Sequence, residues 1–153
     1  MVLNCQSKKG KQAMQEERLA MQSFCDVFKY QWCETPHNTM AACDGVLVKE
    51  GELQAVGEVK CRYNVGFDDF FDRFNGEWLV TASKLQKCKD IADGLGVNFV
   101  GFLYLVDSKK LLFKPITSWR SEETETITNI NNPTLVKRLN GFVDMAGSKY
   151  LSL

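Results

Sequence analysis

The residues best suited to chemistry lie in segment 44–60, which reads DGVLVKEGELQAVGEVK. Two short apolar runs flank a turn signal around Gly51, and this pattern predicts a β-hairpin. If the turn is centred on Gly51, the numbers of paired residues sum to about 102, and Asp44 lies opposite Glu58 with Cβ atoms roughly 5 Å apart. Glu58 and Lys60 share a face because side chains alternate along a strand. Two carboxylates and one amine on one patch predict a site for a hard divalent cation.

A third carboxylate, Glu17, falls on the apolar stripe of a helix predicted over residues 11–30. Burying this charge without compensation would cost several kcal/mol, a cost that a nearby metal would remove. The neighbouring Glu16 lies about 100° round the helix and is a weaker candidate. The alternative is that the stripe is drawn one position wrong and that Glu17 is a surface residue. The other members of the stripe are Met14, Met21, Phe24, Cys25, Phe28 and Trp32.

This set of groups suits phosphodiester hydrolysis, which needs an attacking water, neutralisation of charge in the transition state and help for the leaving oxygen. Mg²⁺, with Mn²⁺ as an expected substitute, supplies the first two when it is held by Asp44, Glu58 and the Val59 carbonyl. Lys60 would then position or deprotonate the water. We favour positioning, because an ordinary lysine is protonated at pH 7 and a base role needs a lowered pKa.

Composition limits the other classes of protein. The chain has 153 residues, 44% of them apolar and 25% charged, and we expect one domain over residues 1–153. We identify no signal peptide and no apolar run near the ~20 residues of a membrane span. The six cysteines show no CxxC pair, which favours free core thiols in a reducing, cytoplasmic compartment. His37 is the only histidine, so sites with several histidines are excluded, and we expect His37 at the surface.

The order of predicted elements indicates an α/β protein whose mixed sheet carries helices on both faces. The aromatic segment 64–78 is expected to form a short helix packed over the sheet, with a cover over the site as the alternative. Beyond the first helix, the expected elements are a hairpin over 41–62, a helix over 81–95, strands over 98–106 and 111–116, a loop over 117–132 and a final helix that starts at Asn132-Pro133.

Asp44-Gly45 followed by Glu58-Val59-Lys60 resembles the site of the PD-(D/E)xK nuclease superfamily, and Glu17 matches the upstream glutamate of many members. Residue 43 is cysteine where the family name has proline. The resemblance covers about residues 11–116 and implies a restriction-endonuclease-like core of helix, three-stranded meander, helix and strand. Only two strands are visible before the second helix. The small size and the EVK-CR ending are most similar to the Holliday-junction-resolvase and phage-endonuclease branches, and the segment 117–153 is unaccounted for.

The resemblance implies a Mg²⁺-dependent DNA endonuclease, with Asp44, Glu58 and Glu17 around the metal and Lys60 on the nucleophile. In this family, the helix after the ExK strand often presents polar side chains to the substrate. The residues at those positions, and Arg62 on the Glu58–Lys60 face, are candidates for nucleic-acid binding. The alternative is solvated charges on the helix, or for Arg62 an ion pair with the following loop. The candidates are Arg62, Lys84, Gln86 and Lys87.

Several alternatives stay open for partners and activity. A domain this small covers little of a duplex, so we expect a homodimer, with the final helix as its interface or packed on the core. The apolar residues of that helix are Leu135, Leu139, Phe142 and Val143. A nuclease fold that binds nucleic acid without cleaving it, an exonuclease and an RNA-directed nuclease are the functional alternatives.

Overall fold

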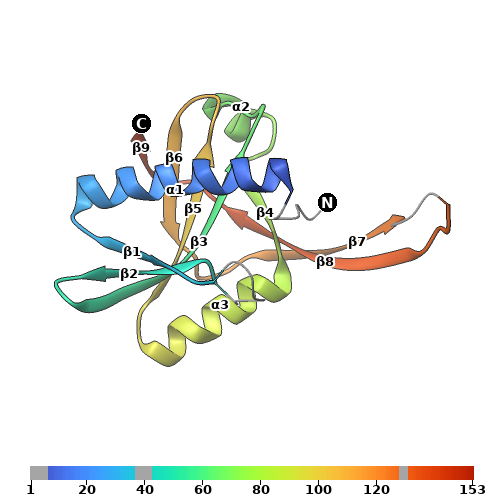
Figure 1. Ribbon diagram of the computed structural model, residues 1–153. Coiled ribbons are helices and arrows are strands. Elements are labelled where there is room, and N and C mark those ends of the chain that lie inside the picture. The colour runs from blue at the N-terminus through green and yellow to red at the C-terminus, as the bar shows by residue number, and fades with distance from the viewer. Residues whose placement is uncertain (1–6, 37–42, 128–130) are drawn as a thin grey trace.

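The computed structural model describes residues 7–36, 43–127 and 131–153, so His37 lies outside it. A mixed six-stranded sheet has the order β1-β2-β3-β5-β6-β9, and a second sheet has the order β4-β8-β7 (Figure 1). The predicted mixed sheet with flanking helices is confirmed. The elements are α1 (Lys8–Phe28), β1 (Gln31–Glu34), β2 (Gly45–Lys49), β3 (Glu52–Arg62), α2 (Phe67–Asp72), β4 (Glu77–Thr81), α3 (Ala82–Leu95), β5 (Asn98–Leu105), β6 (Lys110–Pro115), β7 (Arg120–Ile127), β8 (Leu135–Asp144) and β9 (Lys149–Ser152).

Helices cover both faces of the six-stranded sheet (Figure 1). On one face Phe24 of α1 meets Phe102 of β5 edge-on, with ring centroids 5.0 Å apart. On the other face Leu85 of α3 packs in one core with Val56 of β3 and Trp78 of β4. Strands β3 and β5 run parallel, so the chain crosses over between them through β4 and α3. Residues that alternate along β3 therefore face α1 and α3 in turn.

Strands β1, β2 and β3 form a three-stranded meander, and β1 is the strand that the sequence did not reveal. It lies where the apolar stripe of the first helix was expected to continue. Helix α1 ends at Phe28, because Lys29 takes the left-handed conformation with φ 63°. Trp32 consequently belongs to β1, which pairs antiparallel with β2. Its indole ring lies over Gly45 and Gly57, where an added Cβ would come within 2.6 and 2.7 Å of ring atoms. The prediction that Trp32 continues the helix stripe is wrong, and its ring packs on the meander instead.

The register of the β2–β3 hairpin arises from two features. Glu50 and Gly51 both have positive φ, as the two-residue turn of a hairpin requires. A β-bulge between Leu47 and Val48 then shifts the pairing by one residue, so that Gly45 lies opposite Gly57. Asp44, the next residue, continues this register toward Glu58. Without the bulge, Asp44 would lie opposite Gly57 and Glu58 would point to the other face.

The C-terminal part differs from its prediction. The expected loop over 117–132 contains β7, and the expected helix after Pro133 is β8, which pairs with both β7 and β4. Leu135, Leu139 and Val143 are four residues apart, a spacing that places side chains on one face of a strand as well as of a helix. The hairpin of β7 and β8 extends away from the rest of the molecule (Figure 1). Because the segment after Pro133 is strand β8, the final helix on which the homodimer interface was expected does not form.

The remaining features concern the helices and the thiols. As expected, the aromatic segment contains a short helix, α2, whose Phe70 is buried in the α3-side core. None of the described helices is long and apolar enough to cross a membrane. The five cysteines within the described ranges are thiols rather than disulfides, and four of them are buried: Cys25, Cys43, Cys61 and Cys88.

Gly45→Ala is expected to destabilise the protein by about 1–3 kcal/mol, because the new methyl group would overlap the Trp32 ring and the Cys33 carbonyl oxygen. Urea unfolding measures this change. Gly94→Ala is the matched control, since an added Cβ there meets nothing within 4 Å and α3 gains up to about 1 kcal/mol. Equal stability of the Gly45 variant and the wild type would contradict the packing described for Trp32.

Candidate active site

Two carboxylates occupy the edge of β3 that β2 leaves open. Ladder pairing with β2 stops at Gly45 and Gly57, while β3 runs on to Arg62. Along this free edge the Val59 amide donates to Asp44 Oδ2 at 2.7 Å, and the Cys61 amide donates to Glu17 Oε2 at 3.1 Å. The acids thus replace the missing strand as hydrogen-bond acceptors. The N–H and C=O of one strand residue point to the same side, so the Val59 carbonyl faces this edge as well.

The backbone of Asp44 is held on both sides. Its amide donates to the Gly57 carbonyl oxygen at 3.1 Å, and its own carbonyl oxygen accepts from the Thr35 amide at 2.9 Å and from Thr35 Oγ1 at 3.0 Å. Thr35 follows β1 directly, so the third strand of the meander fixes the first acid. Sequence reasoning missed Thr35, because it identified no strand over residues 31–34 that could bring Thr35 next to Asp44.

Glu58 is a fully buried carboxylate at the centre of the fold, with 0% of its surface exposed. Its Oε1 lies 3.0 Å from Lys84 Nζ and 3.6 Å from Lys60 Nζ. Its Oε2 has no hydrogen-bond partner among the described residues. Burial, and after it the charge of Asp44, raises the pKa of Glu58 to about 8, although both lysines act in the opposite direction. A buried acid with one unpartnered oxygen is an incomplete arrangement unless a cation joins it.

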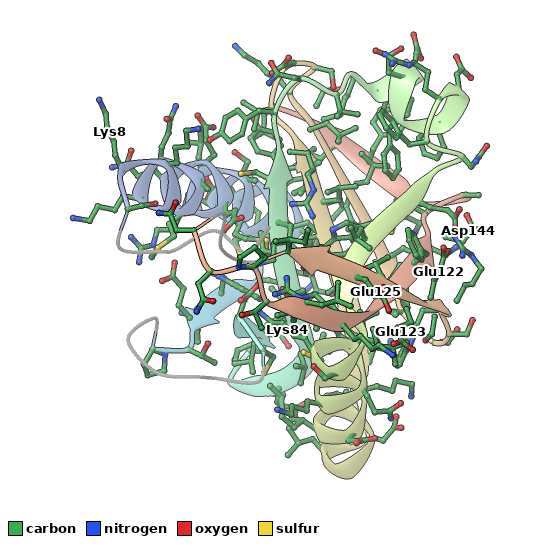
Figure 2. The ribbon with its side chains drawn as sticks, turned by 90° about the vertical axis from the view of Figure 1, so that its right-hand side faces the viewer. Lys8, Lys84, Glu122, Glu123, Glu125 and Asp144 are labelled. Atoms are coloured by element: carbon green, nitrogen blue, oxygen red, sulfur yellow. The ribbon has the colours of Figure 1, made fainter. Side chains whose placement is uncertain are left out.

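Lys84 connects the two sheet acids. It extends from the first turn of α3, and its Nζ lies 3.2 Å from Asp44 Oδ1 and 3.0 Å from Glu58 Oε1. Burial alone would lower the pKa of Lys84, but the carboxylates of Glu58 and Asp44 raise it above its ordinary value. Lys84 is partly buried, with 28% of its side chain exposed, and in Figure 2 it falls inside the outline of the molecule, whereas the exposed Lys8 of α1 extends outward. The sequence predicted Lys84 as a residue that contacts nucleic acid, and this internal ion pair was not foreseen.

Glu17 lies on the α1 side of the same edge, as its place on the apolar stripe predicted. Burial raises its pKa, while Lys60 and the Cys61 amide lower it. Glu17, Asp44 and Val59 line a small pocket of about 20 Å³, which has room for about one water-sized guest. At the same pocket Arg18 donates two hydrogen bonds to Glu34, at 2.7 and 3.0 Å. Sequence reasoning did not single out this pair, since no local spacing joins a helix residue to a strand end.

The remaining predicted residues lie on two elements, Lys60 and Arg62 on β3 and Gln86 and Lys87 on α3. Lys60 lies beside Glu58 with 37% of its side chain exposed, and Arg62 donates to the Cys61 and Leu79 carbonyl oxygens at 3.0 and 3.2 Å. Burial lowers the pKa of Arg62. Gln86 and Lys87 are exposed on α3, and the Gln86 amide donates to Asp90. Lys60 therefore lies at the site, whereas Gln86 and Lys87 do not contact its acids.

The donors present fit a hard cation. Within the described ranges, no three His, Cys, Asp or Glu side chains are close enough together to form a ready metal centre. Asp44 and Glu58 nevertheless direct one oxygen each at a single positive charge, the ammonium of Lys84, and Glu58 Oε2 is unpartnered. Carboxylate oxygens with a nearby backbone carbonyl are the donors that Mg²⁺ takes, together with water. Asp44, Glu58 and Val59 are thus the residues able to hold such an ion.

The raised pKa of Glu58 predicts how stability depends on pH in the metal-free protein. The folded protein keeps this proton up to about pH 8, whereas the unfolded chain releases it near pH 4.3. The folded state then binds more protons between these values, and the free energy of unfolding falls as the pH rises, by up to about 1.4 kcal/mol per unit. Urea unfolding in EDTA at several pH values measures this slope. Glu58→Gln should flatten it and the exposed Glu52→Gln should not; an unchanged slope in the Glu58 variant would contradict the assignment.

Comparison with known proteins gives a structural similarity alone. No family model matches the sequence, and no curated protein matches it. Among solved structures, the chain is similar to a Holliday junction resolvase from the archaeal hyperthermophile Archaeoglobus fulgidus. The TM-score is 0.42 and the identity is 14%, over 64% of this chain and 73% of that chain.

Proposed function

We propose that this protein is a Mg²⁺-dependent nuclease that hydrolyses phosphodiester bonds in DNA. The observation that supports it most strongly is the Lys84 ammonium held between Asp44 and the buried Glu58. This contact marks a position that takes positive charge, and Asp44, one of its two acids, has 22% of its side chain exposed. An ion pair with a purely structural role would need only one lysine and its acids. This site also has a second lysine, Lys60, carboxylates along the free edge of β3, and an acid of raised pKa, Glu58.

In this proposal Asp44, Glu58 and the Val59 carbonyl hold the metal, and Glu17 lies at the pocket beside it. The metal supplies neutralisation of charge on the phosphate and a more acidic water. Lys60, half-exposed beside Glu58, positions the attacking water and contacts the phosphate. Thr35 and the Val59 amide keep Asp44 oriented, so the carboxylate does not need to reorganise when the substrate arrives.

The charges around the site suggest how a nucleic acid would approach. Lys8, Lys9 and Lys11 are exposed on the first turn of α1, the helix that carries Glu17. Cations of this kind bind phosphates electrostatically. In contrast, β7 carries Glu122, Glu123 and Glu125, which in Figure 2 lie on the far side of Lys84 from Lys8. We therefore place the duplex against the α1 side, with Arg62 as a further candidate contact and a homodimer as the expected assembly. Gln86 and Lys87 lie on α3, across the sheet from α1, and are candidate contacts only for a nucleic acid that also reaches the α3 side.

The test is cleavage by the purified chain of supercoiled, linear and branched DNA and of RNA, in Mg²⁺, in Mn²⁺ and in EDTA. We expect cleavage of DNA in either metal and none in EDTA. Asp44→Asn and Lys60→Met should each lower the rate by about 100-fold or more, because each removes a group that acts on the reacting phosphate or water. Lys89→Met is the matched control, since Lys89 pairs with Asp93 on the same helix face and lies outside the site.

The outcomes separate the alternatives. Cleavage that survives EDTA, or that Asp44→Asn leaves unchanged, would contradict the proposal. Binding of DNA without cleavage of any substrate would instead indicate a nuclease fold that only binds nucleic acid. Preference for RNA, or for free ends over closed circles, would keep the metal site and change the substrate class.

A further inference from the structure

We propose that Lys84 is an internal counter-ion that occupies the cation position between Asp44 and Glu58, and that it must be displaced before a divalent metal ion binds there. This inference rests on the proposed function, because it concerns the same metal site. It differs from the role that the sequence suggested for Lys84, which was contact with nucleic acid. It makes Lys84 a positioning residue that sets the affinity of the site for its metal.

The first argument is geometric. The ammonium contacts Asp44 Oδ1 at 3.2 Å and Glu58 Oε1 at 3.0 Å, one oxygen from each sheet acid. A divalent ion held by the same two oxygens would sit close to the position that Nζ now takes. Two positive charges cannot share that position, since like charges a few ångströms apart in a poorly solvated site repel strongly. Lys84 and the metal therefore compete for the same oxygens.

The second argument concerns which partner is able to leave. Glu58 is fully buried on a central strand, and Asp44 is held by the Val59 and Gly57 backbone groups. Burial therefore restrains Glu58, and hydrogen bonds from and to the β3 backbone restrain Asp44. Lys84 has 28% of its side chain exposed and carries its charge on a flexible four-carbon stem. Displacement consequently moves Lys84 outward and leaves the acids in place.

The third argument is that the two acids direct one oxygen each at a single position, which takes a positive charge whether or not a metal is bound. If both carboxylates were left without a positive charge, the buried one would carry an unpaired charge in a poorly solvated site or take up a proton. Lys84 supplies the charge when metal is absent, and the metal supplies it when bound. Lys60 does not replace Lys84 in this role, because its Nζ is 3.6 Å from Glu58 and is more exposed.

Metal affinity tests the competition directly. Calorimetric titration of the EDTA-stripped full chain with Mn²⁺ gives the Kd of the wild type, Lys84→Met and Lys84→Arg. We expect Lys84→Met to bind Mn²⁺ at least about fivefold more tightly, the lower end of ordinary coupling between two ligands, and Lys84→Arg to stay near the wild type. Lys89→Met, which removes the same charge from a position on α3 where the lysine pairs with Asp93 and lies outside the site, should leave the Kd unchanged. An equal or weaker affinity of the Lys84→Met variant would overturn the proposal.

A measurement on the wild type does not depend on how the variants fold. Side-chain ¹⁵N spectra of the lysine ammonium groups should show a signal for Lys84 in the metal-free chain, identified by its loss in Lys84→Arg. Saturating Mg²⁺ should abolish or strongly shift that signal, and persistence of the signal would overturn the proposal. Tighter Mn²⁺ binding by Lys84→Met without DNA cleavage by the wild type would support the counter-ion role and reject the nuclease. DNA cleavage by the wild type, together with an unchanged Kd of Lys84→Met for Mn²⁺, would support the nuclease and reject the counter-ion role.

Discussion

The burial of one carboxylate, that of Glu58, sets the terms for the rest of the site. The side chain lies on a central strand with no exposed surface, and one of its oxygens has no hydrogen-bond partner among the described residues. Such a group raises the energy of the fold unless a positive charge accompanies it. Lys84 and Lys60 approach it from α3 and from β3 itself, and Asp44 adds a second negative charge beside it. A site built in this way is suited to a cation before any substrate is considered.

The meander supplies the geometry that this charge cluster needs. The bulge at Leu47 and Val48 sets the register that continues Asp44 toward Glu58. The end of β2 at Gly45 leaves backbone amides of β3 without strand partners, and the carboxylates of Asp44 and Glu17 accept from them. Gly45 itself is required because the Trp32 ring leaves no space for a Cβ. Packing on the α1 side and chemistry at the open edge are thus fixed by the same short segment.

The sequence predicted the parts of the site that depend on local pattern. The alternation of the hairpin gave the shared face of Glu58 and Lys60, and the helical stripe brought Glu17 toward the sheet. The predicted turn centre was wrong, because Lys49 pairs with Glu52, and Asp44 aligns with Glu58 only because the bulge shifts the register. Sequence reasoning also failed where two patterns share a spacing. The spacing of Leu135, Leu139 and Val143 fits a helix and a strand equally well. β8 is a strand because it pairs with β4, which is distant in sequence, and with β7, which was expected to be a loop.

Taken alone, the sequence determined the mixed α/β architecture, the two sheet acids, the lysine beside them and the glutamate of the first helix, because strand and helix periods act over a few residues. Only the tertiary structure decided that Lys84 lies between the acids, that Thr35 holds Asp44 and that the C-terminal segment forms strands. Each of these depends on contacts between elements that are distant along the chain. No local period encodes such contacts, since they follow from how the elements pack once the hydrophobic faces have been buried.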